Sequence, residues 1–480
     1  MICATNPFSF ILFGASGHLA KLKIYPALYT LASRKRLPDN FAIVGFSRSE
    51  MNNNSFKTLV EESIRMHVSD IDEDVLSSLL EKTYYQQGQY NSKESFEELQ
   101  NKLNEIEKPW DSPIRIGYLS VPPSVFPDVL KNMCAAHIHA DKENFRCIVE
   151  KPVGNDLKSG EEIYKKLRNC FDDKEIFFLD HFLGKEAVRN AYFLRHANPV
   201  LERLFKNTLI HHVEITASES VGIEGRSGYF DNVGTFRDMV QSHLLLTASL
   251  LTMRLVENFD LFRAKRQSAM EQLYLPPANS LDDVVLQGQY TSGVVEGEDV
   301  IGYLEEEGIS KSSRTNTYAA IKLLSRTSRW QGVPFYLKSG KRLDKKETRV
   351  SIQFQETSPI GEGSEPNRLD IILQGEAGMR LHLQTKLGGT DPSFRPLIME
   401  DPLVCIGDCL PEHGLLLLEV INGNQQWFLS FDEVKTAWNI IDPLQKYLDN
   451  KNTPLYTYKA GTSGPEEANK WIKKDNINWF

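Results

Sequence analysis

Short apolar runs alternate with amphipathic stretches over the first third of the chain. Residues 8–13 form the first apolar run, and residues 19–32 place leucines and an isoleucine near helical spacing. Further runs of the first kind follow at 41–46, 115–121, 146–150 and 175–180. A charged helical stretch occupies 51–82. Strands separated by helices predict an α/β fold with a doubly wound parallel sheet.

The pattern changes after about residue 183. Longer alternating runs, which predict strands, lie at 213–218, 284–290, 348–355, 369–374 and 378–385. Because several are close neighbours, they favour an α+β domain with a mostly antiparallel sheet and helices on one face. Residues 357–366 predict a loop. We therefore expect two domains, residues 1–183 and residues 184–480.

Composition narrows the class of protein. The chain has 480 residues, 41% of them apolar and 25% charged, as in folded globular proteins. A net charge of −9 argues against a nucleic-acid binder. The apolar run at 8–13 is too short and lacks the basic start of a signal peptide. The weakly polar run at 239–253 is too short to span a bilayer, so we expect no membrane association.

The cysteines are scattered and form no C-x-x-C pair. This distribution is typical of a reducing compartment and favours the cytoplasm. A metal site built from Cys134, His137, His139 and Cys147 has poor support, because these residues more naturally line or flank a helix. We expect no metal.

A glycine turn follows the first predicted strand and opens a helix. Backbone N–H groups at such a helix N-terminus favour a pyrophosphate, and glycine lets the backbone approach it. The spacing is G-x-x-G, so the motif alone is equally consistent with a plain turn. In its strand context it predicts a Rossmann-like dinucleotide site. The residues expected to hold the cofactor there are Gly14, Ala15, Ser16, Gly17 and Leu19.

The end of the second strand favours NADP. NAD sites usually carry an acid there for the ribose hydroxyls, whereas an arginine accommodates a 2′-phosphate. Here Arg48 stands at that place and no acid occurs before Glu50. Together with Lys23, it predicts NADP, although a single arginine is more often simply solvated.

Two histidine segments predict chemistry on an anionic substrate. Asp180, His181 and Lys185 follow a strand, where open α/β sheets place their sites. Asp238 and His243 lie on a predicted helix. A neutral histidine can accept a hydroxyl proton near neutral pH when a carboxylate orients it. One such histidine alone would more often be structural, so the argument depends on their density.

A second glycine-rich and basic loop spans 332–342 and is followed by Lys345 and Lys346. Lysine is suited to phosphate, so Lys341 and Lys346 are candidate anion ligands. The alternative is a solvated basic turn, which would be preferred without the other motifs.

Taken together, these motifs resemble the glucose-6-phosphate dehydrogenase family. The resemblance covers nearly the whole chain in the right order. Its most specific segments are LDHFLGKEAVRN (179–190) and GIEGRSGYFDNVGTFRDMVQSHLL (222–245). Its other landmarks are GASGHLAKLKIYPALYTL (14–31), VGFSRS (44–49), VEKPVG (149–154), GVPFYLKSGKRL (332–343) and YKAGTSGPEEA (458–468).

The resemblance implies oxidation of glucose 6-phosphate at C1 to 6-phosphogluconolactone, with hydride transfer to NADP, the first step of the oxidative pentose phosphate pathway. It implies that His243 is the general base and Asp180 its carboxylate partner. The substrate-binding residues that it implies are His181, Lys185, Glu219, Asp238, Lys341 and Lys346. Lys151 matches a segment beside the nicotinamide whose peptide bond to Pro152 can be cis. The large sheet would be the surface of a homodimer or homotetramer.

Several positions depart from the family pattern. His18 stands where an aspartate is usual, Phe182 where a tyrosine hydroxyl would contact phosphate, and Ser242 where an asparagine is common. We expect a working enzyme with weakened sugar-phosphate binding. Vertebrate relatives hold a second, structural NADP through basic residues. Glu347 and Leu373 stand in that region here, so we expect one cofactor per chain.

Two other functions remain open. One is a dehydrogenase acting on another sugar phosphate. The other is a non-catalytic regulator that binds a dinucleotide, motivated by His18 and Phe182. Intact His243 and Asp180 argue against the regulator, because it has no need of a base.

Overall fold

The computed structural model describes all residues except 1–2, 140–143, 357–364, 391–392, 405–406 and 408. Contacts among the Cα atoms divide the chain into two compact units, residues 1–186 with 405–434 and residues 187–404 with 435–480. The division after residue 183 therefore remains a prediction from the sequence. No sequence feature indicated that residues 405–434 belong with the first unit.

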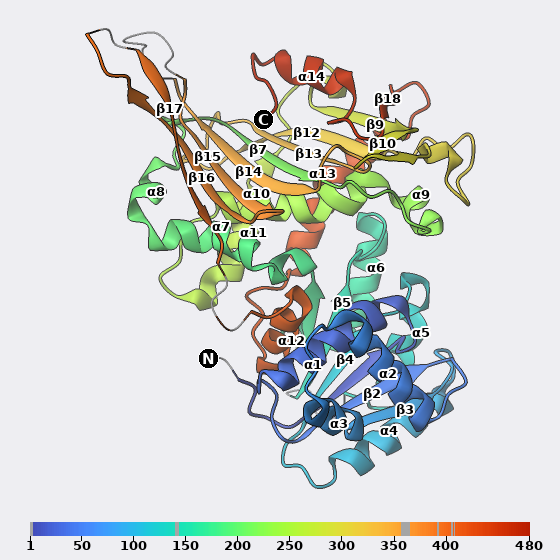
Figure 1. The fold of residues 1–480 in the computed structure, drawn as a ribbon. Helices are drawn as coiled ribbons and strands as arrows, with labels where there is room; N and C mark the ends of the chain where they lie inside the picture. The colour runs from blue at the N-terminus through green and yellow to red at the C-terminus, as the bar shows by residue number, and fades with distance from the viewer. Residues whose placement is uncertain (1–2, 140–143, 357–364, 391–392, 405–406, 408) are drawn as a thin grey trace. The chain divides into compact units, whose positions relative to one another are not determined.

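The first unit contains a six-stranded sheet with helices on both faces (Figure 1). Its strands are β1 (Phe8–Phe13), β2 (Phe41–Ser47), β3 (Thr83–Gln87), β4 (Ile114–Leu119), β5 (Phe145–Glu150) and β6 (Ile176–Leu179). Its α-helices are α1 (Tyr25–Ser33), α2 (Asn53–His67), α3 (Glu73–Glu81), α4 (Lys93–Glu107), α5 (Phe126–Ala135), α6 (Leu157–Arg168) and α12 (Glu412–Asn422). Its short helical turns include η1 (Ala20–Ile24) and η4 (His181–Gly184).

All strands of this sheet are parallel, in the order β3-β2-β1-β4-β5-β6. The helices α1, α2 and α3 contact one another, whereas α4 contacts α5 and α5 contacts α6. Right-handed crossovers place these two groups on opposite faces. Every residue of β1 and β2 is buried, as expected for central strands covered on both faces. The predicted doubly wound parallel sheet is confirmed.

Two details of the first unit differ from the sequence prediction. The charged stretch 51–82 forms two helices, because Val68 is extended and the Asp72 side chain caps α3 by accepting from the N–H of Asp74 and of Val75. The strand β3 was missed. It is a short strand at the edge of the sheet with the polar sequence TYYQQ, so it lacks the apolar run of the central strands.

The helix α12 packs against α1 and η4, although it lies more than 200 residues further along the chain (Figure 1). A Cβ at Gly184 would overlap Glu412 O, so this close approach requires glycine. The sequence gives no signal for such a long-range contact.

The expectation of reduced cysteines is not met in the first unit. Cys134 at the end of α5 and Cys170 just after α6 form a disulfide, with their Cα atoms 5.8 Å apart. Packing of α5 against α6 brings these two residues together across a separation of 36 residues, which no spacing motif reveals. The disulfide also removes Cys134 from the metal site considered above.

The second unit is built on a ten-stranded sheet. Its strands are β7 (Ile210–Ser218), β8 (Leu273–Tyr274), β9 (Val285–Thr291), β12 (Tyr318–Ser325), β13 (Phe335–Gly340), β14 (Glu347–Phe354), β15 (Arg368–Gln374), β16 (Gly378–Lys386), β17 (Phe394–Pro402) and β18 (Tyr456–Lys459), and β10 (Gly293–Val295) pairs with β11 (Glu298–Val300) separately. Its helices are α7 (Glu186–Ala197), α8 (Pro199–Leu204), α9 (Ser227–Thr235), η5 (Phe236–Leu244), α10 (Leu245–Thr252), α11 (Phe262–Glu271), α13 (Phe431–Leu448) and α14 (Glu466–Lys473). The chain crosses between the units within α7 and α13.

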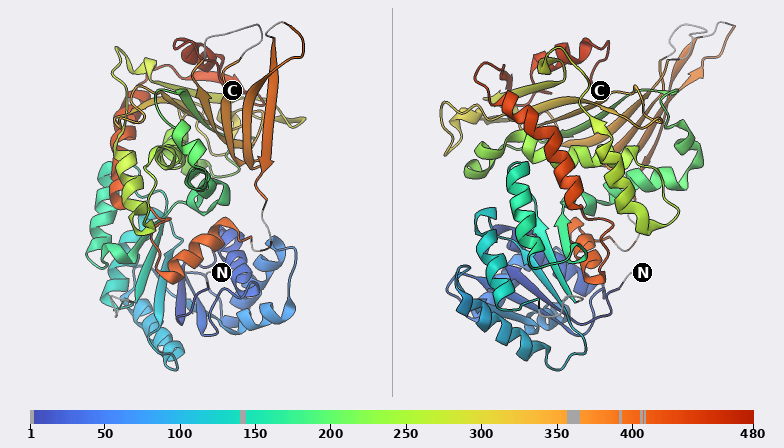
Figure 2. Two further views of the ribbon diagram at one scale, coloured as in Figure 1. Left: turned by 90° about the vertical axis from the view of Figure 1, so that its left-hand side faces the viewer. Right: turned by 180° about the vertical axis from the view of Figure 1, so that it is seen from behind.

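The large sheet has the order β17-β16-β15-β14-β7-β13-β12-β9-β18, and β8 pairs with β12. All pairs along it are antiparallel except β7 with β13 and β9 with β18. The predicted, mostly antiparallel sheet is thus confirmed. The helices α10 and α11 lie on one face, and the short α14 covers part of the other (Figure 1, Figure 2).

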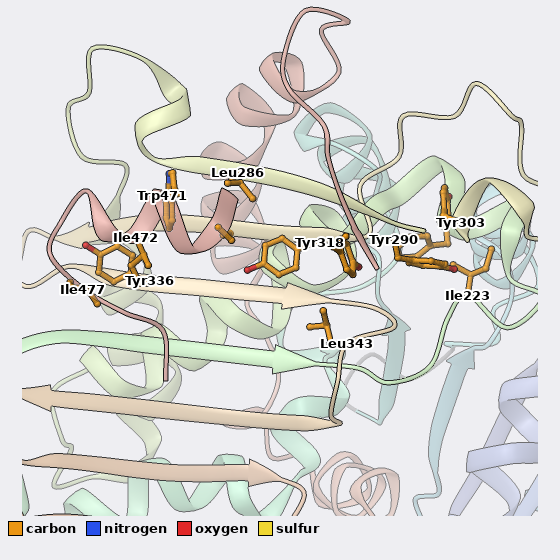
Figure 3. Packing of buried hydrophobic residues seen from close by; sticks show 14 of the residues in the cluster. Ile223, Leu286, Tyr290, Tyr303, Tyr318, Tyr336, Leu343, Trp471, Ile472 and Ile477 are labelled. Carbon is orange, nitrogen blue, oxygen red and sulfur yellow. The ribbon is translucent and has the colours of Figure 1, made fainter. Parts of the chain in front are cut away.

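An aromatic cluster fills the space between the sheet and α14 (Figure 3). The Tyr336 ring lies against Trp471 of α14, with the ring centroids 5.9 Å apart, whereas Tyr290 lies beside Tyr303 at the other end of the cluster. Burial of such side chains contributes roughly 1.5–3 kcal/mol each. The cluster therefore fixes the segment around β18 and α14 on the sheet. Among the described residues, no helix is both long and apolar enough to cross a membrane.

Candidate active site

The turn after β1 brings the backbones of neighbouring strands close together. Gly14 has a φ of +86°, and its N–H donates to Phe46 O at 2.9 Å. A Cβ at this position would overlap Ser120 O, so the turn requires glycine. The Gly17 N–H closes the turn onto Gly14 O at 2.8 Å, and the helix follows directly. This helix N-terminus lies where the strand order reverses between β1 and β4, a geometry that fits a pyrophosphate.

Two further residues of the turn support its shape. Ala15 is buried, and its carbonyl accepts a hydrogen bond from Tyr25 Oη at 2.6 Å. Burial raises the pKa of the Tyr25 hydroxyl well above its ordinary value, so the proton that it donates is retained. Leu19 lies half-buried in the first helical turn.

Serine hydroxyls connect this turn to the end of β2. Ser16 Oγ lies 3.3 Å from Ser47 Oγ and 2.9 Å from Ser49 Oγ. Between these two serines, Arg48 is exposed, and its guanidinium carbon lies 5.6 Å from the centre of the Tyr90 ring. The structure thus places the candidate 2′-phosphate ligand beside the candidate pyrophosphate turn, within one unit.

The other two cofactor candidates have different surroundings. Lys23 Nζ lies 3.4 Å from Glu412 Oε1 of α12, so its charge is shared with a carboxylate. Its role toward the cofactor remains a prediction. Lys151 follows β5 and is half-buried. The Lys151–Pro152 peptide bond is cis, which confirms what the resemblance implies.

Asp180 holds a buried carboxylate at the carboxyl end of β6. Its exposed fraction is 0%. Its Oδ1 accepts from the Phe182 N–H at 2.9 Å, and its carbonyl accepts from the Leu183 N–H at 3.0 Å. The side chain therefore caps η4 and has a fixed orientation.

The η4 turn brings His181, Phe182 and Lys185 together. Lys185 Nζ lies 4.2 Å from the centre of the buried Phe182 ring, a cation–π contact. The half-buried His181 ring stacks with His413 of α12, their centroids 6.4 Å apart. Sequence reasoning missed His413, because nothing in the sequence connects α12 with η4.

In the second unit, β7 and β13 run parallel, so Glu219 and Lys341 leave the same end of the sheet. The Glu219 N–H donates to Gly340 O at 3.0 Å, which joins the two strand ends. Lys341 Nζ lies 2.6 Å from Glu219 Oε2, and the lysine side chain is 2% exposed. Because an ammonium carries three N–H donors, Lys341 can hold both Glu219 and an anionic ligand.

The helix η5 carries Asp238 and His243. His243 is buried, with 2% of its surface exposed, and its carbonyl accepts from Thr247 Oγ1 at 2.7 Å. Asp238 is half-buried, and its carbonyl accepts from Ser242 Oγ at 3.1 Å. Packing of η5 against β7, β12 and β13 places these two side chains on the helix-covered face of the large sheet.

Two residues that sequence reasoning missed support η5. Asn316 Oδ1 accepts from the Phe236 N–H at 3.3 Å and so caps the first turn of the helix. The Tyr229 hydroxyl forms a hydrogen bond with Asp238, and burial, together with this carboxylate, raises the pKa of Tyr229. The only feature of the sequence that could have indicated the Tyr229–Asp238 contact is their closeness in the chain, since Tyr229 precedes Asp238 by nine residues.

Each unit thus assembles its own part of the predicted set. The first unit gathers Asp180, His181 and Lys185 in one turn, and the second pairs Glu219 with Lys341. Lys346 is exposed in the segment before β14, so its role remains a prediction.

Family models and related proteins point to the same family. Residues 11–190 match the model for the NAD binding domain of glucose-6-phosphate dehydrogenase, and residues 192–480 match the model for its C-terminal domain. The chain is 32% identical over 495 residues to a glucose-6-phosphate 1-dehydrogenase of Chlamydia pneumoniae, covering 98% of this chain and 96% of that protein. It is 35% identical over 479 residues to the enzyme of the same name from Schizosaccharomyces pombe, covering 97% and 93%.

Solved structures agree. A glucose-6-phosphate dehydrogenase in complex with its substrate glucose-6-phosphate superposes with a TM-score of 0.89 at 29% identity, covering 100% of both chains. A glucose-6-phosphate 1-dehydrogenase from Mycobacterium avium gives 0.86 at 28% identity, covering 99% of both chains.

Proposed function

Because the chain belongs to the glucose-6-phosphate dehydrogenase family, we propose that it oxidises glucose 6-phosphate at C1 to 6-phosphogluconolactone with NADP as hydride acceptor. This reaction is the first step of the oxidative pentose phosphate pathway. The observation that carries the proposal is the match of both family domains over nearly the whole chain. The local geometry supports it, because the candidate residues lie at strand ends and on a buried helix.

We assign the base to His243. It accepts the proton of the C1 hydroxyl as C1 gives up hydride, so no charge has to build up on the sugar oxygen. Asp180 stabilises the resulting histidinium. Both side chains are buried, with 0% of Asp180 and 2% of His243 exposed.

We assign six further charged or ionisable residues to the sugar phosphate. His181, Lys185, Lys341 and Lys346 are the proposed phosphate ligands, and Glu219 and Asp238 accept hydrogen bonds from sugar hydroxyls. Lys341 and Glu219 already form a close pair, so they present one donor group and one acceptor group together. Contacts remote from C1 fix the reacting carbon and can contribute several kcal/mol to the rate.

The first unit fits the dinucleotide. The turn at Gly14, where a Cβ would overlap Ser120 O, fits a pyrophosphate. The exposed Arg48 beside the turn fits a 2′-phosphate. The proposed ligands are Gly14, Ala15, Ser16, Gly17, Leu19, Lys23, Arg48 and Lys151. When bound, the nicotinamide supplies the hydride acceptor, so the proposal requires no metal.

The proposal extends to assembly and location. The edge strand β17 exposes large apolar side chains, among them Ile398 at 54% and Met399 at 55%. An edge strand with such exposed apolar side chains is suited to pairing with a second copy, as a homodimer or as part of a homotetramer. We also propose a cytoplasmic location, although the Cys134–Cys170 disulfide removes the support that the scattered cysteines gave to it.

The test is substrate selectivity. The absorbance of reduced nicotinamide should rise with glucose 6-phosphate and NADP, and far more slowly with unphosphorylated glucose or with NAD. Faster turnover of another sugar phosphate would replace the proposed substrate. Binding of NADP without turnover of any sugar phosphate would instead favour the regulator.

A further inference from the structure

The segment 458–462 has no role in the chemistry proposed above, yet it forms hydrogen bonds with the loop that carries Lys341. Tyr458 lies in β18 and is buried, with 4% of its surface exposed. The Gly461 N–H donates to Arg342 O at 2.8 Å, and the Asp344 N–H donates to Thr462 O at 3.1 Å. The backbone of this segment is thus joined to the chain at two positions directly after Lys341.

The Tyr458 hydroxyl reaches Lys341 itself. It donates to Lys341 O at 2.7 Å, while Thr317 Oγ1 lies 3.1 Å from the same hydroxyl. The Lys341 N–H donates to Thr317 O at 2.9 Å. Because a phenol has one proton and its shortest contact is Lys341 O, the Thr317 hydroxyl donates in turn to Tyr458. Both backbone groups of Lys341 are therefore fixed by Tyr458 and Thr317.

Charge and burial support this direction of donation. Burial raises the pKa of Tyr458 far above its ordinary value, so the hydroxyl keeps its proton. Hydrogen bonds in such a chain strengthen one another in a low-dielectric interior. The Lys341 side chain leaves the fixed backbone to meet Glu219 at 2.6 Å.

We propose that Tyr458 is a positioning residue for the substrate-binding lysine, holding the Lys341 backbone so that its ammonium and the Glu219 carboxylate face the sugar phosphate in a fixed geometry. The proposal rests on the function proposed above, because it concerns the same substrate site. It gives the motif at 458–468 a role in substrate affinity.

The surroundings allow this role to be isolated. The centroid of the Tyr458 ring lies 5.8 Å from that of Tyr318 and 6.4 Å from that of Tyr290 in the aromatic cluster. Tyr458→Phe keeps this ring and removes only the hydroxyl. The matched control is Tyr336→Phe, which removes another hydroxyl of the same cluster, one that donates to Asp475 Oδ2 at 2.7 Å.

Steady-state kinetics test the proposal. Tyr458→Phe should raise KM for glucose 6-phosphate about threefold to tenfold, the effect of one lost hydrogen bond. It should leave kcat within about twofold and KM for NADP unchanged, and Tyr336→Phe should alter none of these constants. Wild-type turnover of glucose 6-phosphate is measured first, so failure of the proposed function is seen separately.

A double-mutant cycle separates positioning from general stability. In a Lys341→Gln background the lysine is absent, so Tyr458→Phe should add no further rise in KM. If Tyr458→Phe fails to fold, Thr317→Val tests the same hydrogen-bond chain and should raise KM for glucose 6-phosphate. An unchanged KM in the folded variant, or an equal rise with and without Lys341, would overturn the proposal.

Discussion

At the residue scale, Phe182 illustrates how one missing oxygen can shape a substrate site. The resemblance implies a tyrosine at this position whose hydroxyl contacts phosphate. In this chain the buried phenyl ring lies 4.2 Å from Lys185 Nζ. The ring thus still supports the lysine, but it offers no hydrogen bond to an anion.

Phe182→Tyr is expected to lower KM for glucose 6-phosphate by about twofold to tenfold, the range of one added hydrogen bond. KM for NADP serves as the internal control and should not change. A variant with the wild-type KM for the sugar phosphate would show that the hydroxyl is not what weakens binding.

Lys338 presents a different residue-scale feature, a cation inside the second unit. Its side chain is 6% exposed, and Nζ lies 4.2 Å from the centre of the Trp479 ring. Burial lowers the pKa of Lys338 to about 8, Glu214 and Asp344 oppose this shift, and Arg349 and Lys345 reinforce it. Folding therefore becomes more favourable when this lysine is neutral.

The sign of the pH effect follows from linkage. Between about pH 8 and the ordinary lysine value near 10.4, the unfolded chain binds the proton that the folded chain has lost, so stability rises with pH. Relative to Lys338→Met, the wild type should gain up to about 3 kcal/mol of unfolding free energy across this window. Urea unfolding of both proteins at several pH values measures it. A constant difference would contradict the assignment.

At the element scale, the sequence predicted the central strands well because they are short apolar runs between turns. β1 and β2 have nearly the bounds that their apolar residues suggest. β13 was not predicted as a strand, since Lys338, Ser339 and Gly340 make FYLKSG resemble a loop. It is nevertheless a fully buried strand, because pairing with β7 and β12 satisfies its backbone.

The candidate site shows the same limit. Asp180, His181, Asp238 and His243 could be proposed because each lies in a dense local motif. His413 and Asn316 were not, because they reach η4 and η5 from other parts of the chain. Local sequence patterns report which side chains share an element. They do not report which distant element packs against it.

Gly14→Ala tests the phosphate turn as an element. A Cβ with a φ of +86° is strained and would overlap Ser120 O, so the turn would have to move. We expect NADP affinity to fall by at least about fivefold, as a strain of about 1–3 kcal/mol implies. Fluorescence titration with NADP measures it, and Gly228→Ala is the control because a Cβ there meets open space. Unchanged NADP affinity would remove this turn from the cofactor site.

At the scale of the whole molecule, the number of cofactors per chain can be tested. Glu347 Oε1 lies 3.0 Å from Lys345 Nζ and 3.6 Å from Arg349 Nη1, so it reduces the positive charge near β14. A second dinucleotide held there by basic residues is therefore disfavoured. Titration of pure protein should give one tight NADP site per chain, and two tight sites would contradict this expectation.

Hydrophobic periodicity alone predicts that a region with a parallel sheet is followed by a region with a mostly antiparallel sheet. The return of residues 405–434 to the first unit could not, because helix α12 is apolar over most of its length and gives no indication of its partner. The disulfide between Cys134 and Cys170 could not be predicted either, because the packing of α5 against α6 brings the two cysteines together.

His243 is the residue that we assign as the base for the C1 hydroxyl proton. The most direct test of this assignment is the turnover of glucose 6-phosphate with NADP by the wild type and by His243→Asn, with binding of both ligands measured separately. We expect kcat to fall by about a hundredfold to ten-thousandfold, the contribution of a general base, with both ligands still bound. A variant that retains wild-type kcat would contradict it.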